Sequence, residues 1–224
     1  MIILGGLNLT LKVGVIGATG MAGSAIVNEA VRRGFEVTGF VRNADKARDM
    51  LPDGVKLVTK DAFEIQRVDI SDLDVLVDAF ATHDMSQAYK HVDLAARLVE
   101  LAKDTDKPRL FFILGAASLE TGNGHRLIDK LEKMPNNESF IEVPRQQFKE
   151  YQLLMNTKNV NWVAVSPSAN FKPGDATDFV LGKDSLLTNA AGKSEITSET
   201  MAKVINDEME HPTHHNERFT AVGQ

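Results

Sequence analysis

The chain of 224 residues contains no cysteine, two tyrosines and one tryptophan. The absence of cysteine excludes disulfides, thiolate catalysis and zinc–thiolate sites, and it is compatible with the cytoplasmic location that we expect. A net charge of −6 without a basic block gives no electrostatic footprint for nucleic acid. No apolar run reaches the length of a transmembrane helix, so we expect no membrane partner.

The composition that remains is that of a globular protein, with 43% hydrophobic residues. This length and apolar content predict a single domain over residues 1–224. Residues 1–11 are apolar but lack the basic start and cleavage site of a signal peptide. We expect them to form an N-terminal extension or an additional edge segment.

The most informative segment is KVGVIGATGMAG, which begins at Lys12 and ends at Gly23. A short apolar strand runs into a turn that contains Gly17, Gly20 and Gly23, and a helical segment follows. Such a turn brings backbone N–H groups at a helix N-terminus against a pyrophosphate. The alternative is a tight turn that binds nothing, but the strand–turn–helix–strand context favours a dinucleotide site.

The second strand, residues 36–41, is followed by Arg42 rather than by an acidic residue. An acid at this place bonds the ribose hydroxyls of NAD, whereas arginine suits the 2′-phosphate of NADP. The sequence therefore favours NADP(H) over NAD(H). Two alternatives stay open: a solvated Arg42, and an ion pair between Arg42 and Asp45.

Strand-like and helix-like segments alternate along the rest of the chain. The expected strands are residues 13–16, 36–41, 55–59, 74–80, 109–114, 160–165 and 219–222, and the expected helices are 24–33, 44–51, 86–103, 145–157 and 197–210. This order predicts a Rossmann-type α/β fold, with a doubly wound, mostly parallel sheet and helices on both faces. Residues 116–144 and 171–193 interrupt the alternation. We expect them to wall a substrate pocket, the second as a loop or hairpin in a small C-terminal capping region.

Four segments together resemble a known family: GATGMAG, the strand end FVRN, the strand end LGAAS, and SPSANFKPG. From Lys12 to the C-terminus the chain resembles the atypical short-chain dehydrogenase/reductases. Within them it is similar to the NAD(P)H-binding group that holds NmrA-like proteins, biliverdin-IXβ (flavin) reductases and proposed NADH-flavin reductases.

This resemblance implies a role for each matching residue. The pyrophosphate would contact the first loop, the 2′-phosphate Arg42, and the adenine, ribose and nicotinamide the later strand ends. In that order the implied cofactor residues are Gly17, Thr19, Gly20, Met21, Ala22 and Gly23; Arg42; Asp61 and Ala62; Ala79, Phe80 and Ala81; Leu114, Gly115 and Ala116; and Pro167, Ser168 and Ala169.

The chain departs from the wider superfamily at its proton-transfer pair, Tyr-x-x-x-Lys. Tyr89 is followed four residues later by Asp93, and Tyr151 by Met155. A tyrosine without a nearby lysine is a poor acid or base near neutrality. Ordinary alcohol dehydrogenation is therefore disfavoured, whereas reduction of a flavin or quinone tolerates a site in which solvent supplies the proton.

Several polar and aromatic residues are candidates for the substrate pocket. Ser118 is the one catalytic candidate, as a hydrogen-bond donor, with a turn or cap residue as the alternative. His125 and Phe171 are pocket candidates, each with an alternative role in the loop or in packing. The histidines near residue 214 lack a ligand framework, so we expect no metal.

The sequence thus predicts hydride transfer from NADPH to a flavin, quinone or similar conjugated acceptor. The alternative is a non-catalytic, redox-sensing NADP-binding regulator, as in NmrA-like proteins. A relative of sugar-nucleotide epimerases is disfavoured by the broken Tyr-x-x-x-Lys pair. We expect a small-molecule partner, flavin as a possible substrate, and a monomer or homodimer.

Overall fold

The structure of the protein is a computed structural model that describes residues 10–82 and 84–224. The expected N-terminal extension, residues 1–11, lies almost entirely outside the described residues. Within the described part of the chain, no helix combines the length and the apolar character needed to cross a membrane.

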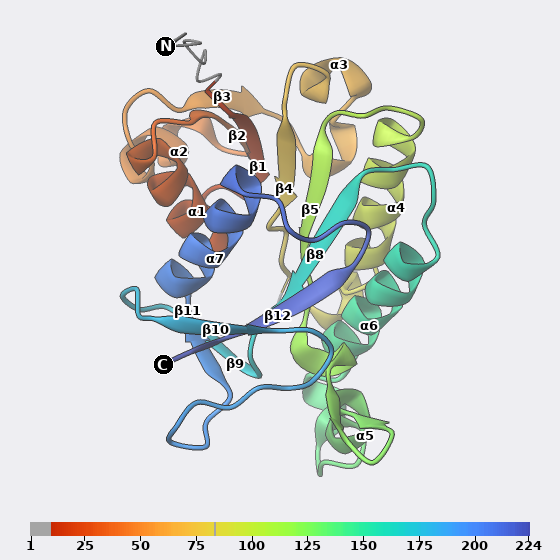
Figure 1. Ribbon diagram of the computed structural model, residues 1–224. Helices are drawn as coiled ribbons and strands as arrows, with labels where there is room; N and C mark the ends of the chain where they lie inside the picture. Colours follow the sequence, from red (N-terminus) through yellow and green to blue (C-terminus); the bar gives the residue numbers. More distant parts are fainter. Residues whose placement is uncertain (1–9, 83) are drawn as a thin grey trace, which may run out of the picture.

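A central sheet of eight strands organises this part of the chain, in the order β10-β12-β8-β5-β4-β1-β2-β3 (Figure 1). Neighbouring strands are parallel except for β10 and β12, which are antiparallel. Crossover connections place the carboxyl ends of the parallel strands at one edge. The strands are β1 Lys12–Ile16, β2 Glu36–Val41, β3 Lys56–Thr59, β4 Val75–Asp78, β5 Arg109–Ile113, β8 Trp162–Ser166, β10 Phe179–Gly182 and β12 Arg218–Gly223.

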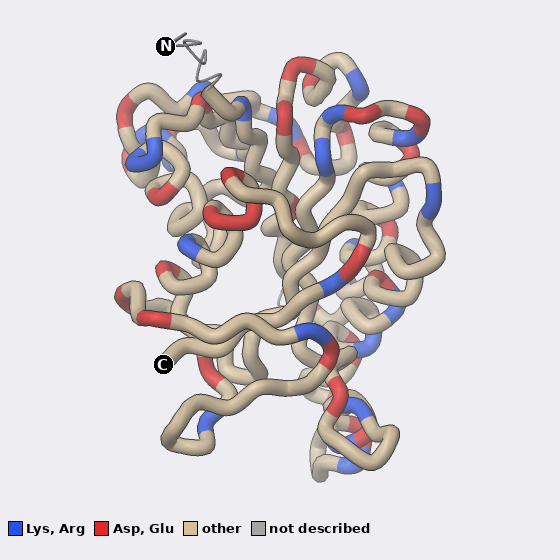
Figure 2. The backbone as a smooth tube through the Cα atoms, in the orientation of Figure 1, with Lys and Arg blue, Asp and Glu red and all other residues tan. Residues whose placement is uncertain are grey.

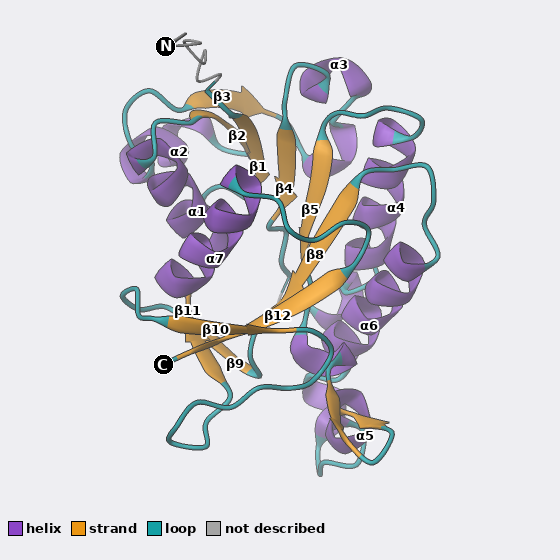
Figure 3. Ribbon diagram, in the orientation of Figure 1, coloured by secondary structure: helices purple, strands orange, loops and turns teal. Residues whose placement is uncertain are grey.

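Helices cover both faces of the sheet, which confirms the predicted Rossmann-type fold (Figure 3). Helices α1 Met21–Arg32, α2 Ala44–Met50 and α7 Ser198–Glu210 belong to the core on one face, and α4 Lys90–Ala102 and α6 Glu142–Met155 to the core on the other. Two short helices are α3 Arg67–Ile70 and α5 Leu127–Leu131. Charged residues gather on the helices and loops, and the middle of the sheet carries few (Figure 2).

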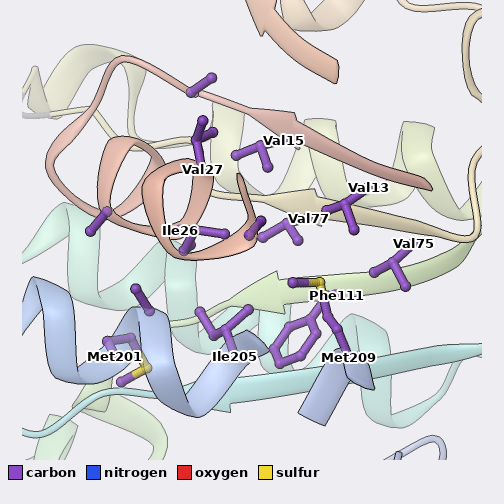
Figure 4. Close-up of a cluster of buried hydrophobic side chains, with 14 of the residues drawn as sticks. Val13, Val15, Ile26, Val27, Val75, Val77, Phe111, Met201, Ile205 and Met209 are labelled. Carbon is purple, nitrogen blue, oxygen red and sulfur yellow. The ribbon is translucent and has the colours of Figure 1, made fainter. Parts of the chain in front are cut away.

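The two apolar cores follow from the alternation of side chains along each strand. Val13 and Val15 of β1 face α1 and α7, where Ile26 and Ile205 are fully buried (Figure 4). Ile16 belongs to the opposite core, beneath α4 and α6. Strands buried on both faces read as nearly continuous apolar runs, which is why the sequence identified them.

Helix α6 begins at Glu142, three residues before the predicted start. Pro144 therefore lies in the first turn of α6. The first N–H groups of a helix have no partner within it, so a proline there costs no helical hydrogen bond. The proline misled the prediction because it reads as a helix breaker.

The hairpin predicted within residues 171–193, all of which the structure describes, is wrong. Strand β9 Asn170–Lys172 pairs with β11 Glu195–Thr197, and β10 pairs with β12. The segment after β10 instead bonds to β6 Glu120–Gly122, whose own antiparallel partner is β7 His125–Arg126. There Glu120 donates its N–H to Asp184 and accepts from Leu186, both at 2.8 Å. These backbone bonds replace those of a hairpin.

Candidate functional site

The first loop, between β1 and α1, is built around the carbonyl oxygen of Gly17. The N–H of Gly20 donates to this oxygen at 2.8 Å. A Cβ on Gly23 would lie 2.1 Å from the same oxygen, so α1 can approach β1 only with glycine there. Gly17 itself has φ +72°, and a Cβ on it would meet the carbonyl oxygen of Ala79 at 2.7 Å. The sequence GATGMAG therefore has a steric reason at its first and last glycine.

The N-terminus of α1 is open to an anion. Gly20 is its N-cap, and among the described residues no side chain caps the helix there. The first N–H groups of a helix need a partner and carry partial positive charge. A phosphate at this place satisfies both requirements. The loop thus fits the pyrophosphate that the sequence predicts for it, and Thr19, Met21 and Ala22 lie in the same turn.

The end of β4 lies directly beside this loop. The N–H of Ala79 donates to the carbonyl oxygen of Ile16 at 3.1 Å, and Phe80 follows with its N–H bonded to Asp78 at 3.0 Å. Strand β1 separates the two halves of the sheet, so β1 and β4 flank the topological switch point where ligands bind in such folds. Ala81 is exposed at the same edge.

Arg42 follows β2 and is exposed. Asp45, its expected competitor, pairs instead with Arg48 at 2.6 Å. Among the described residues, Arg42 takes part in none of the ion pairs. Asn43 caps α2 by accepting the N–H of Lys46 at 3.0 Å, so the turn that carries Arg42 is ordered by its neighbours.

The end of β3 lies beside the end of β2. The N–H of Lys60 donates to the carbonyl oxygen of Val41 at 3.0 Å. Asp61 follows and accepts the N–H of Phe63 at 2.9 Å, which starts a short 3-10 helix at Ala62. The two residues predicted near the adenine are therefore neighbours of Arg42 at the same edge.

The segments after β5 and β8 form the other side of this edge. Leu114 donates its N–H to Val165 at 2.9 Å, which ties the two strand ends together. A Cβ on Gly115 would lie 2.2 Å from Oε1 of Gln147, so the amide of α6 rests on the Gly115 backbone. Ala116 then opens a 3-10 helix, Ala116–Ser118. Sequence reasoning missed Gln147, whose proximity only the folded chain reveals.

After β8 the chain is held in place by two hydrogen bonds. The hydroxyl of Ser168 donates to the carbonyl oxygen of Ala221 at 2.9 Å, and the N–H of Ala169 donates to Ser194 at 3.1 Å. Pro167 and Ser168 are buried, whereas Ala169 is exposed. Phe171, predicted for the pocket, packs partly against the core beneath α1 and α7.

Ser118, the predicted hydrogen-bond donor, is buried beside Arg218. The guanidinium of Arg218 donates to Ser118 Oγ at 3.1 Å and to Ser166 Oγ at 3.2 Å. It also bonds Asp184 at 2.8 Å and lies 4.7 Å from the ring centroid of Tyr151. The Arg218 side chain is 0% exposed. The sequence analysis did not identify this arginine as part of the site. Its one local signal was a charged residue at the start of an apolar strand.

The two remaining histidine predictions have separate outcomes. His125 is exposed and pairs with Asp129 at 3.5 Å. His214 bonds Glu208 at 2.8 Å and stacks on Phe219, with 4.3 Å between the ring centroids. Among the described residues, no cluster of potential ligands could hold a metal ion. His214 is thus part of the packing around Glu208.

A buried cluster of titratable side chains lies behind the end of β4. Asp78, His91 of α4 and Glu150 of α6 are 7%, 3% and 3% exposed, and His91 Nδ1 lies 3.9 Å from Glu150 Oε2. Burial raises the pKa of Asp78 to about 7, and burial together with Asp78 raises the pKa of Glu150 well above its usual value. Burial lowers the pKa of His91 to about 4. Burial thus favours the protonated form of both acids and the neutral imidazole more than solvent does.

Together, the fold and the loop at its switch point define a Rossmann-type NAD(P)-binding protein. The NAD(P)H-binding family model matches residues 17–212, and the chain belongs to this family. The uncharacterized protein YwnB of Bacillus subtilis is 37% identical over 96% of this chain and 99% of its own.

Solved structures agree with this assignment. A Lactobacillus casei protein has a TM-score of 0.89 at 39% identity and covers 95% of this chain and 99% of its own. A proposed NADH-flavin reductase of Streptococcus pneumoniae has a TM-score of 0.87 at 31% identity, over 96% of this chain and 100% of its own. A proposed epimerase of Bacteroides thetaiotaomicron has a TM-score of 0.83 at 31% identity, over 96% of this chain and 98% of its own. These relatives are consistent with the resemblance to atypical short-chain dehydrogenase/reductases.

The buried cluster generates a prediction about stability and pH. Because the pKa of Asp78 is higher in the folded than in the unfolded chain, the folded state keeps a proton that the unfolded state releases. The wild-type free energy of unfolding therefore loses this contribution as the pH rises from about 4 to about 7. Asp78→Asn cannot titrate. Its free energy of unfolding relative to wild type should increase by roughly 2 kcal/mol between about pH 5 and pH 8.

Urea unfolding of both proteins at the two pH values measures this difference. A constant offset, such as the cost of placing an amide at residue 78, cancels in the comparison. A difference between the variant and wild type that stays the same at both pH values would contradict the raised pKa.

Proposed function

We propose that the protein is an NADPH-dependent reductase that transfers a hydride to a flavin, a quinone or a similar conjugated acceptor. The observation that carries this proposal is the loop from Gly17 to Gly23, with its uncapped helix N-terminus beside Ala79. Membership of the NAD(P)H-binding family and similarity to a proposed NADH-flavin reductase support it.

The preference for NADPH rests on the end of β2. Arg42 is exposed there, its acidic neighbour Asp45 pairs elsewhere, and no acid ends the strand. A guanidinium in this place is suited to the 2′-phosphate by charge and by its forked geometry.

The chain's own part in the reaction is alignment and exclusion of water. When bound, NADPH would supply the hydride. The loop at Gly17 would hold the pyrophosphate, the segments at Gly115 and Pro167 would enclose the nicotinamide, and the acceptor would lie over them. Holding two planar rings in contact supplies much of the catalysis in such a step, and solvent supplies the proton.

A non-catalytic NADP-binding regulator is the second candidate. The observation that favours it is the broken Tyr-x-x-x-Lys pair at Tyr89 and Tyr151. One curated relative, the photosystem II assembly factor Ycf39 of Guillardia theta, is 29% identical over 62% of this chain and 45% of its own length. The two candidates differ in one result: turnover of NADPH with an acceptor.

A side chain at Gly20 should weaken the binding of NADPH to the loop. Gly20 has φ −79°, and a Cβ there would lie 3.2 Å from the Gly17 carbonyl oxygen, so other residues fit with a small adjustment. Gly20→Val should fold but place two methyl groups in the phosphate path. Fluorescence titration should show NADPH affinity lowered at least tenfold, with a smaller loss for Gly20→Ala. Unchanged affinity in a folded Gly20→Val variant would remove this loop as the cofactor site.

Arg42 should discriminate between the two cofactors. A charge-assisted contact contributes about 1.5–3 kcal/mol, so Arg42→Ala should weaken NADPH by roughly tenfold or more and leave NADH nearly unchanged. Arg32→Ala removes an equal charge from the last turn of α1, where Arg32 pairs with Glu29 at 2.7 Å, and is the matched control. Equal losses of NADPH and NADH in Arg42→Ala would show that Arg42 does not bind the 2′-phosphate.

Catalysis should not depend on the tyrosine hydroxyl. Tyr151→Phe keeps the ring that stacks against Phe148 and lies over Arg218. Reduction of flavin or quinone should therefore stay near the wild-type rate, whereas Ser118→Ala should show a moderate loss. Loss of a general acid would lower the rate about a hundredfold or more. Such a loss in kcat/KM of Tyr151→Phe, together with a missing limb in its pH profile, would restore a tyrosine mechanism.

A further inference from the structure

Arg218 connects four segments of the chain that are distant in sequence. Its guanidinium bonds Ser118 after β5, Ser166 at the end of β8 and Asp184 after β10, and it lies over the ring of Tyr151 on α6. The first two segments lead into the residues expected around the nicotinamide and the acceptor. One buried cation therefore sets the relative position of several walls of the proposed pocket.

Arg218 lies inside the protein, whereas its carboxylate partner lies nearer to solvent. The Arg218 side chain is 0% exposed, whereas its partner Asp184 is 41% exposed. A second guanidinium, that of Arg126, is 31% exposed; it donates to the carbonyl oxygen of Ser118 and lies 3.5 Å from Glu120, which is 50% exposed. Water screens the exposed carboxylate of Asp184 more than the buried guanidinium of Arg218. Arg218 is therefore a buried cation beside Ser118 whose counter-charge lies partly in solvent.

The hydrogen bond to Arg218 also sets the direction of the Ser118 hydroxyl. Ser118 Oγ accepts from the guanidinium at 3.1 Å, and a guanidinium can only donate. The hydroxyl proton of Ser118 is therefore directed to another acceptor. A hydroxyl whose oxygen is bonded to a cation is a stronger donor than a free one.

We propose that Arg218 is a positioning residue of the acceptor pocket, which orients the Ser118 hydroxyl toward the acceptor and stabilises the negative charge gained there on reduction. This inference rests on the proposed function. The acceptor gains a hydride, that is two electrons and one proton, while NADPH becomes NADP⁺. The acceptor thereby carries one added negative charge until a proton from solvent neutralises it.

This arrangement accounts for a reductase that lacks the Tyr-x-x-x-Lys pair. A protein acid is not required when a preformed donor and a buried cation stabilise the anion before protonation. The stabilisation is larger in a site that excludes water. The chemistry suits acceptors whose reduced form is an anion with delocalised charge, such as flavins and quinones.

The test compares Arg218→Met and Arg218→Lys with a matched buried arginine. Arg109 is also buried and paired, with Glu208 at 2.7 Å, but it begins β5 at the opposite edge of the sheet. Arg218→Met should lower kcat for flavin reduction on the order of 10- to 100-fold, with a much smaller loss of NADPH affinity. Arg218→Lys, which keeps the charge, should recover part of kcat. Arg109→Met should lower the melting temperature and leave kcat and KM near wild type.

Equilibrium binding supplies a readout that is independent of turnover. Arg218→Met should bind oxidised flavin nearly as well as wild type but bind anionic reduced flavin about tenfold more weakly, as measured anaerobically. A purely structural role would weaken both forms equally. Equal weakening, or an unchanged kcat in Arg218→Met, would overturn the assignment.

A double-mutant cycle covers the case in which Arg218→Met does not fold. The logarithm of the factor by which Arg218→Lys lowers kcat is compared in two backgrounds. In the Ser118→Ala background it should be less than half of its value in wild type. Fully additive losses would overturn an action through Ser118. Wild-type protein that binds NADPH but reduces no acceptor would overturn the proposed function, and this assignment with it.

Discussion

The position of one backbone oxygen, the carbonyl of Gly17, determines how the first strand meets the first helix. It accepts the N–H of Gly20, and it occupies the space that a side chain at Gly23 would need. The close approach of α1 to β1 leaves the helix N-terminus open at the sheet edge, directly beside Ala79. A dinucleotide site then follows from backbone geometry, because N–H groups and the helix dipole supply the anion binding.

The proposed chemistry also depends on few side chains. Two buried polar clusters lie at the carboxyl edge: the acids around Asp78, whose pKa values are raised, and the guanidinium of Arg218. Neither is a tyrosine–lysine pair. Hydride transfer to a conjugated acceptor needs alignment and stabilisation of charge more than a strong acid, and Arg218 with Ser118 is suited to that need.

The parts of the molecule that depend on local sequence could be predicted. Apolar runs such as RLFFIL identified buried strands, and the glycine spacing from Gly17 to Gly23 identified the first loop, because each signal lies within a few neighbouring residues. The helix start before Pro144 and the pairing of β10 were predicted wrongly. Pro144 is tolerated in the first turn of a helix, whereas β10 pairs with a strand distant in sequence.

The Arg218 and Asp78 clusters could not be predicted, because their members meet only through the sheet. Arg218 is 100 residues from Ser118 and 34 from Asp184, and its place at the start of an apolar strand does not reveal these partners. The account as a whole depends on direct hydride transfer, which NADPH deuterated at the reactive C4 position tests most directly. We predict that NADP⁺ formed during acceptor reduction has lost the deuterium from one face of C4, and that the transfer rate falls relative to unlabelled NADPH. Tight NADPH binding with no oxidation of the labelled cofactor by any flavin or quinone would contradict the account and identify the protein as a nucleotide sensor.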